Sequence, residues 1–137
     1  NEGRVELHEK LSLTGAEISI NQLPAGASVP FVHSHKNNEE IYGILSGKGK
    51  AVIDSEEIEL TTGDWLKIAP AAKRQFFASK DLGITYVCIQ VKENSLDGFT
   101  ADDAVLYLVY YLKSRSTVKE CSKTVLLIYF RNVLCKF

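Results

Sequence analysis

Residues 30–49, read as PFVHSHKNNEEIYGILSGKG, constrain this chain more than any other stretch. His33 and His35 are two apart in an alternating run, and residues i and i+2 of a β-strand project from the same face. Glu40 follows a short polar interruption and starts a second alternating run. Two neutral imidazoles and a carboxylate on one interior face form a partial ligand shell for a divalent transition metal. The histidine pair alone, or the glutamate alone, is just as typical of a solvated surface as of a metal site. The metal hypothesis therefore depends on their combination.

The rest of the chain up to about residue 95 is typical of an all-β protein. Strand-like segments recur at intervals of about 8 to 12 residues and are closed by Gly, Pro, Asp or Asn. This rhythm predicts an antiparallel sandwich or barrel and argues against βαβ units. In the first strand we expect Ile18 and Ile20 on the buried face. Turns are expected at residues 47–49 and 54–56, and Ser55 would be strained if its φ angle is positive.

Composition and charge exclude several classes of protein. A length of 137 residues favours a domain with its own core, and a net charge of −1 gives no electrostatic basis for binding nucleic acid or an anionic membrane. No apolar run reaches the roughly 18 residues that a spanning helix needs. The three cysteines are widely spaced and include no C-x-x-C pair, which favours a reducing compartment. We therefore expect a cytoplasmic protein.

With these features in view, the chain resembles the cupin superfamily, specifically the small single-domain RmlC-like cupins of the cupin_2 conserved-barrel type. The first motif of that family combines a glycine, an H-x-H pair, a glutamate and a second glycine. The matching residues here are Gly26, His33, His35, Glu40 and Gly47. The resemblance covers roughly residues 10–95. It implies an antiparallel double-stranded β-helix, the jelly-roll or cupin barrel.

The second family motif is matched with one departure. Gly63, Asp64 and Pro70 occupy their usual places, but Gln75 stands where most metal-binding cupins have a third histidine. The resemblance implies that the ligands of one divalent metal are His33, His35, Glu40 and Gln75. A carboxamide oxygen is a harder and weaker donor than imidazole, which favours Mn, Fe or Ni over Cu. Zn is also compatible with such a ligand set.

Strand alternation within this fold predicts which side chains face the ligand. Tyr42 and Ile44 should lie beside Glu40, and Phe77 should lie beside Gln75. Aromatic walls around a metal are typical of a small-molecule pocket. The alternative for each aromatic residue is that it simply fills the core. Alternation leaves open whether Trp65 or its neighbour Leu66 points inward.

The chain changes character near residue 100. Val105, Leu108, Val109 and Leu112 stand at helical spacing, and a second such stripe runs through residues 126–137. We therefore separate a barrel domain, residues 1–100, from a C-terminal extension, residues 101–137. The extension is interpreted either as two short helices or as a non-native tail.

Two hypotheses of function follow. The first is a metal-dependent isomerase, lyase or dioxygenase acting on a small polar or carbohydrate-like substrate, with Glu40 and, on weaker grounds, Tyr42 in catalytic roles. The second is a non-catalytic cupin that binds a sugar or small acid with a weak or absent metal. Cupins commonly pair through their sheets, so the resemblance also implies a homodimer.

Overall fold

A computed structural model describes residues 3–107 of the chain. By contact pattern the chain divides into two units, Asn1–Asp97 and Gly98–Phe137. In the second unit the described part contains one 3-10 turn, η1 (Thr100–Asp102), and residues 104–107 are not helical. The rest of the predicted helices lies outside the described residues.

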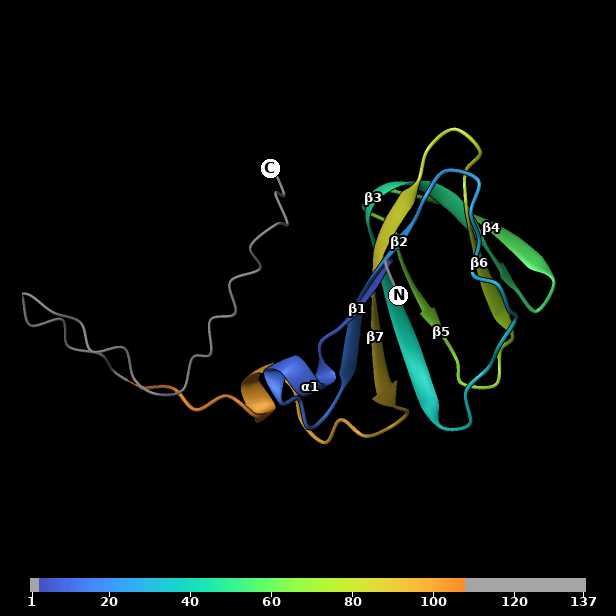
Figure 1. The fold of residues 1–137 in the computed structure, drawn as a ribbon. Coiled ribbons are helices and arrows are strands. Elements are labelled where there is room, and N and C mark those ends of the chain that lie inside the picture. The colour runs from blue at the N-terminus through green and yellow to red at the C-terminus, as the bar shows by residue number, and fades with distance from the viewer. Residues whose placement is uncertain (1–2, 108–137) are drawn as a thin grey trace, which may run out of the picture. The chain divides into compact units, whose positions relative to one another are not determined.

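The first unit is an antiparallel β-barrel, which confirms the predicted all-β fold (Figure 1). The described residues of this unit form seven strands. Five of them pair in the order β1-β2-β7-β3-β4, and the other two, β5 and β6, pair with β3. A short helix separates the first two strands. The elements are β1 (Arg4–Glu6), α1 (His8–Leu11), β2 (Glu17–Leu23), β3 (Asn38–Ile53), β4 (Glu56–Thr61), β5 (Trp65–Ile68), β6 (Arg74–Ala78) and β7 (Ile84–Lys92).

Strand β3 joins the two sheets of the barrel. It is 16 residues long, and its first part pairs with β7 and β5 while its second part pairs with β4 and β6. In the β7 ladder Glu40 lies opposite Gln90, and Tyr42 lies opposite Cys88. One strand therefore carries the predicted site and also connects it to both sheets.

The turn that we expected at residues 47–49 is not a hairpin, because β3 continues through it. The ladder with β7 contains an irregularity between Ile44 and Ser46, and Gly47 follows with a φ of 87°. A Cβ atom on Gly47 would overlap the carbonyl oxygen of Gly83. Glycine is therefore required here by both the dihedral angle and the close approach of the neighbouring backbone.

The expected turn between β3 and β4 is present. Asp54 and Ser55 have φ angles of 47° and 75°, as in the two-residue hairpin loops that need positive φ at both positions. The Asp54 carboxylate accepts a hydrogen bond of 2.9 Å from the Lys73 backbone N–H. Ser55 has a Cβ atom and therefore carries the strain that its φ angle implies.

Replacing Ser55 with glycine should raise the free energy of unfolding by about 0.5 to 1 kcal/mol. Relief of about 1–2 kcal/mol of left-handed strain outweighs the added backbone entropy of glycine in the unfolded chain. Urea denaturation measures the change. Ser55→Ala is the control, because it keeps the Cβ atom. An equal gain in both variants would show that the serine hydroxyl, not the backbone, is responsible.

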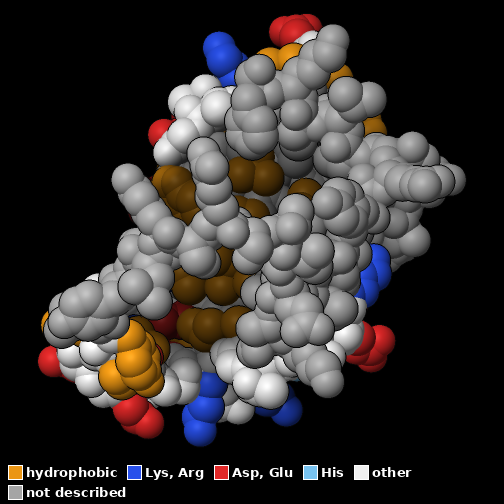
Figure 2. Space-filling model, turned by 90° about the vertical axis from the view of Figure 1, so that its left-hand side faces the viewer, with side chains coloured by type: hydrophobic (Ala, Val, Ile, Leu, Met, Phe, Trp, Pro, Cys, Tyr) orange, Lys and Arg blue, Asp and Glu red, His pale blue; other side chains and the backbone are white. Residues whose placement is uncertain are grey.

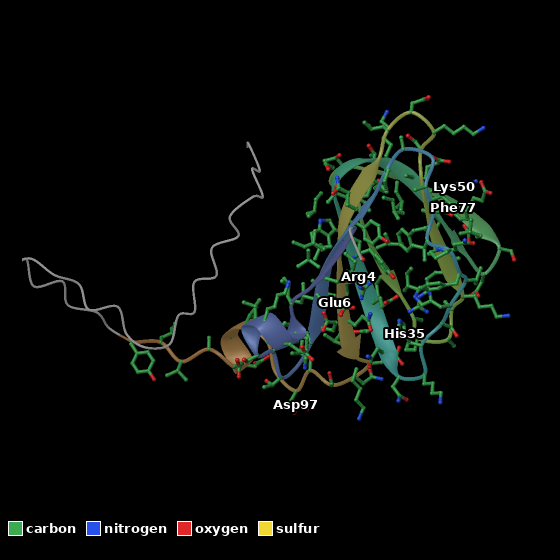
Figure 3. All side chains as sticks on the ribbon, in the orientation of Figure 1. Arg4, Glu6, His35, Lys50, Phe77 and Asp97 are labelled. Carbon is green, nitrogen blue, oxygen red and sulfur yellow. The ribbon has the colours of Figure 1, made fainter. Side chains whose placement is uncertain are left out.

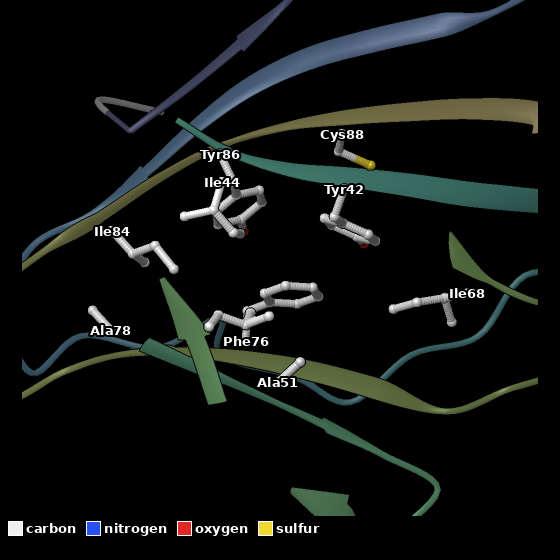
Figure 4. Packing of buried hydrophobic residues seen from close by; sticks show 10 residues of the cluster. Tyr42, Ile44, Ala51, Ile68, Phe76, Ala78, Ile84, Tyr86 and Cys88 are labelled. Carbon is white, nitrogen blue, oxygen red and sulfur yellow. The ribbon is translucent and has the colours of Figure 1, made fainter. Parts of the chain in front are cut away.

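The core consists of alternate residues of the strands, and aromatic rings stack at its centre (Figure 4). The Phe76 ring lies 4.4 Å from that of Tyr42 and 5.1 Å from that of Tyr86, measured between centroids. The other members of the cluster are Ile44, Ala51, Leu60, Ile68, Ala78, Ile84 and Cys88. Such offset ring pairs stabilise a core beyond the area they bury.

Strand β2 faces the opposite way from our prediction. Ser19 and Asn21 are buried, at 1% and 6% exposure, whereas Ile20 is 39% exposed. Asn21 Nδ2 donates a hydrogen bond of 3.0 Å to Ser19 Oγ. The expected burial of Ile18 and Ile20 on the inner face is therefore wrong. The inner wall of β2 borders a cavity instead of packed core, and polar groups are tolerated there.

Strand β6 is also reversed relative to the prediction. Arg74, Phe76 and Ala78 are the buried residues, and the expected inward direction of Phe77 is wrong. Lys50 Nζ lies 5.7 Å from the centroid of the Phe77 ring, within the range of a cation–π contact (Figure 3). Alternation predicted correctly that two sets of side chains face opposite ways. It did not reveal which set faces inward.

The outer surface of the barrel exposes some apolar side chains. Trp65 is 62% exposed, and its ring covers Gly43, where a Cβ atom would clash with it. Ile68, on the opposite face of β5, is buried. Figure 2 shows charged side chains toward the edges of one face of the molecule.

The homodimer stays a prediction. Within residues 3–107 no helix is long and apolar enough to cross a membrane.

Candidate metal centre

The two histidines lie in an extended segment before β3 and not in a regular strand. His33 exchanges backbone hydrogen bonds of 3.2 and 2.9 Å with Arg74, which fixes this segment along β6. The His35 N–H donates a bond of 2.8 Å to the Pro70 carbonyl. The two imidazole rings are 5.4 Å apart between centroids and meet edge to face. The segment is extended enough for both rings to point the same way, as alternation predicted.

Glu40, near the start of β3, completes the cluster. One ligand atom from each of His33, His35 and Glu40 lies within 4.8 Å of the other two. The carboxyl group is buried, and the two imidazoles are half-buried. The structure thus brings together three of the four predicted ligands.

Gln75 is not brought to this cluster. Its side chain lies on the half-exposed face of β6, where its amide donates a hydrogen bond of 2.7 Å to the Val29 carbonyl. It does not line the cavity into which the histidines open. The expected interior position of Gln75 is therefore wrong, because the neighbouring residue of β6 points inward instead.

Arg74 takes the interior position and was missed by the sequence reasoning. Its side chain is fully buried, at 0% exposure, and its Nε and Nη2 atoms lie 2.8 and 2.7 Å from Glu40 Oε2. Its Nη1 donates to the carbonyls of Pro70 and Ala72, at 3.0 and 2.6 Å. Arginine is rarely buried without a partner. The only sequence signal was its place two residues before Phe76 on the same strand face.

The two oxygens of Glu40 have different surroundings. Oε2 accepts a hydrogen bond of 2.7 Å from the Tyr42 hydroxyl in addition to its contacts with Arg74. Oε1 lies 2.9 Å from His35 Nε2, and the Cys88 thiol donates a longer contact of 3.5 Å to it. One oxygen is therefore held by the protein, and the other is presented toward the histidines.

These contacts set the protonation of the cluster. Burial by itself would raise the pKa of Glu40, but hydrogen bonds from Tyr42 and Arg74, together with the Arg74 charge, outweigh it and lower the pKa. Burial is the main cause that lowers the pKa of His33, and Arg74 acts in the same direction. At neutral pH the site therefore presents a carboxylate and a neutral His33 imidazole, the forms that bind a metal.

The other titratable groups around Glu40 keep their protons. Burial, followed by the nearby Cys88, raises the pKa of Tyr42 far above its ordinary value. Burial also raises the pKa of Cys88 to about 12, with Glu40 acting in the same direction. The pKa of Tyr86 is raised to about 12 for the same primary reason. Cys88 is therefore a protonated thiol and not a thiolate ligand.

The cluster opens into a cavity of about 600 Å³. Its volume is in the range of pockets that hold small molecules. One wall comes from β1 and β2, another from residues 29–35, and the floor from β3, β6 and β7. The lining side chains include Arg4, Asn21, Phe31, Tyr42, Phe76, Tyr86 and Gln90.

The donor atoms fit a divalent transition metal. Two imidazoles and one carboxylate are the ligand set of facial sites that leave further coordination positions open. His33 Nδ1 is buried and has no hydrogen-bond partner among the described residues, which is costly unless another group binds there. The three ligand atoms are also close enough to share one ion. The chain's own residues therefore support a metal centre made of His33, His35 and Glu40.

Comparison with known proteins agrees with this architecture. The family model described as "Cupin domain" matches residues 20–89. A crystal structure of a cupin protein from Bacteroides fragilis is 67% identical, covers 77% of this chain and 89% of that chain, and superposes with a TM-score of 0.76. A predicted oxalate decarboxylase from Thermotoga maritima shares the fold at 20% identity, with a TM-score of 0.58 over 65% of this chain and 78% of that one.

A curated relative covers a shorter region. An uncharacterized protein from Methanocaldococcus jannaschii is 40% identical over 48 residues, which is 35% of this chain. The match spans only 38% of that relative's own length. The domain match at residues 20–89 lies within the barrel. This chain therefore belongs to the cupin superfamily and carries a small cupin domain.

Proposed function

We propose that this protein is a metal-dependent enzyme of the isomerase, lyase or dioxygenase type that acts on a small polar or carbohydrate-like molecule. The observation that carries the proposal is the convergence of His33, His35 and Glu40 at the wall of a 600 Å³ cavity. The ligand set suits one ion of Fe, Mn, Ni or Zn. A bound metal would supply Lewis-acid polarisation of a substrate oxygen.

The surrounding residues have distinct parts in this proposal. Arg74 keeps Glu40 ionised and fixes one of its oxygens, so the other oxygen is oriented toward the histidines. Tyr42 stays protonated, and its hydroxyl donates a hydrogen bond to Glu40. We therefore assign Tyr42 to positioning the carboxylate rather than to acting as a base. The aromatic rings of the floor, which include Phe76, give this side of the cavity an apolar surface. Such orienting groups strengthen metal ligands.

A second candidate function is favoured by one specific observation. Glu40 is already charge-compensated by Arg74, with two guanidinium contacts below 3 Å, so the carboxylate is satisfied without a metal. This arrangement suits a non-catalytic cupin that binds a sugar or small acid and holds metal weakly or not at all. The two functions differ in whether the purified protein retains an ion.

Metal content distinguishes the enzyme from the non-catalytic binding protein. Protein purified without a polyhistidine tag should contain about one transition-metal ion per chain by elemental mass spectrometry. In the His33→Ala/His35→Ala variant the affinity should fall by more than about 100-fold, because loss of residues that merely orient ligands already costs about 10- to 100-fold. His8→Ala is the matched control, since His8 is exposed and contacts the Ala16 carbonyl away from the cluster.

Two further results would change the assignment. Gln75→Ala should retain the metal, because Gln75 bonds to Val29. Loss of metal in that variant would return Gln75 to the ligand set. Wild-type protein that is empty and takes up none of Fe, Mn, Ni or Zn would contradict the enzyme proposal and leave the binding function.

A further inference from the structure

The wall of the cavity made by β1 and β2 carries polar side chains that are hydrogen-bonded to one another. Arg4 Nη1 donates a hydrogen bond of 3.1 Å to Asn21 Oδ1, and Asn21 in turn donates to Ser19 Oγ. Arg4 Nε also forms an ion pair of 2.9 Å with Glu6. Arg4 and Glu6 both come from β1, as Figure 3 shows. Arg4, Glu6 and Asn21 line the same cavity as the metal centre.

The inward-facing polar side chains of β2 do not maximise the stability of the barrel. Burying Ile18 and Ile20 inside and leaving Ser19 and Asn21 outside would remove more apolar surface from water and leave fewer polar groups to be desolvated. A strand that breaks the local rule in this way is expected at a functional site. The polar face of β2 is therefore explained if the cavity holds a polar ligand that Asn21 and its neighbours help to bind.

The charges identify the kind of ligand. Among the described residues that line the cavity, Arg4 is the one lysine or arginine. The guanidinium fork matches a planar carboxylate. Because Glu6 already offsets part of its charge, the wall suits a monoanion better than a dianionic phosphate ester.

We propose that Arg4 and Asn21 form a carboxylate-binding subsite, so that the ligand of this cavity is a small organic acid. Its carboxylate pairs with Arg4, its carbon skeleton packs on the aromatic floor, and its remaining polar atoms reach the side of His33 and Glu40. The inference rests on the proposed function, since it names the substrate class of that same site.

Isothermal titration calorimetry with benzoate, benzamide and phenyl phosphate tests the proposed carboxylate-binding subsite. Benzoate and benzamide are nearly equal in shape and differ in charge. We expect the full-length wild-type protein to bind benzoate at least about 10-fold more tightly than benzamide, because hydrogen bonds between charged groups are the stronger ones. Arg4→Met should abolish this preference, because the neutral side chain does not favour a carboxylate over a carboxamide. The thermal unfolding of the variant verifies that this edge-strand substitution leaves the barrel folded.

Two other variants sharpen the result. Glu6→Gln removes the carboxylate that competes for Arg4 and should tighten benzoate binding several-fold. Lys50→Met is the control, because Lys50 pairs with Glu57 and does not line the cavity. Equal binding of benzoate and benzamide, or a preference that survives Arg4→Met, would overturn the proposal. Tighter binding of phenyl phosphate than of benzoate would overturn the choice of carboxylate.

The same titrations, repeated after removal of metal with a chelator, keep this proposal separate from the proposed function. An Arg4-dependent preference for benzoate in metal-free protein and in His33→Ala/His35→Ala supports the subsite whether or not the wild type holds metal. A preference that disappears in both would place the benzoate at the metal instead, and would overturn the role of Arg4.

Discussion

Replacing Arg74 with methionine is expected to lower the free energy of unfolding by about 3 to 5 kcal/mol. The substitution keeps much of the side-chain volume but removes the guanidinium whose Nε and Nη2 atoms contact Glu40 Oε2. Glu40 is then left as a buried carboxylate with Tyr42 as its main donor to that oxygen. Urea denaturation followed by far-UV circular dichroism measures the loss.

The double variant Glu40→Gln/Arg74→Met shows the origin of this loss. Removing both charges should recover most of the stability, because an apolar or neutral pair of similar volume often replaces a buried ion pair without penalty. Both stability measurements belong in metal-free protein, where ligand binding does not contribute. A single Arg74→Met variant that loses less than about 1 kcal/mol would mean that Glu40 is not held as a buried charge.

Replacing Gly47 with alanine is expected to cost about 2 to 5 kcal/mol. A non-glycine residue at positive φ costs about 1–2 kcal/mol. The overlap with the Gly83 carbonyl forces a backbone shift that adds about 1–3 kcal/mol. The damage falls where β3 passes from one sheet to the other, so the ladder with β7 must move. Thermal and urea unfolding report the change.

Gly63→Ala is the matched control. Gly63 has a φ of 95°, similar to that of Gly47, but a Cβ atom placed on it meets nothing within 4 Å. It should therefore show only the cost of the dihedral angle, about 1–2 kcal/mol. Equal losses at the two glycines would show that the Gly83 carbonyl moves aside without a measurable penalty.

The sequence did not indicate β1, and the strand expected at the two histidines is only an extended segment. It did predict β2 and β4 to β7, the turn at Asp54 and the grouping of two histidines with Glu40. These features depend on spacing along one segment, and strand geometry converts spacing into direction. Strain at Ser55 was expected on the condition that its φ angle is positive, and the observed φ of 75° meets that condition. The barrel followed from strand number and from the cupin motifs rather than from any single segment.

What the sequence did not reveal was which face of a strand points inward. Period-two alternation defines two faces, and the choice between them is made by the neighbouring strands. In β6 both Phe76 and Phe77 are apolar, so the pattern was balanced, and a buried Arg74 is a rare choice. In β2 the prediction places the apolar face inside. Polar Ser19 and Asn21 face inward there, and Asn21 borders a cavity instead of packed core.

The error over Gln75 has the same cause. Its spacing from Pro70 matches the family motif, but its direction depends on the pairing of β6 with β3 and with the segment around His33. That pairing turns Arg74 toward Glu40 and leaves Gln75 bonded to Val29. Contacts between residues 34 apart in sequence, as in the Arg74 and Glu40 pair, are set by the whole fold and have no local pattern.

The position of Trp65 makes it an intrinsic fluorescence probe of the outer surface. It is the single tryptophan of the chain, and it lies on the outer surface over Gly43, whereas Tyr42 and Tyr86 line the cavity. Indole emission therefore reads the environment outside the barrel and is insensitive to what fills the interior. Association of two copies across this surface would move the emission toward the blue, and occupation of the cavity would leave its wavelength unchanged. One fluorescence spectrum thus distinguishes self-assembly from ligand uptake.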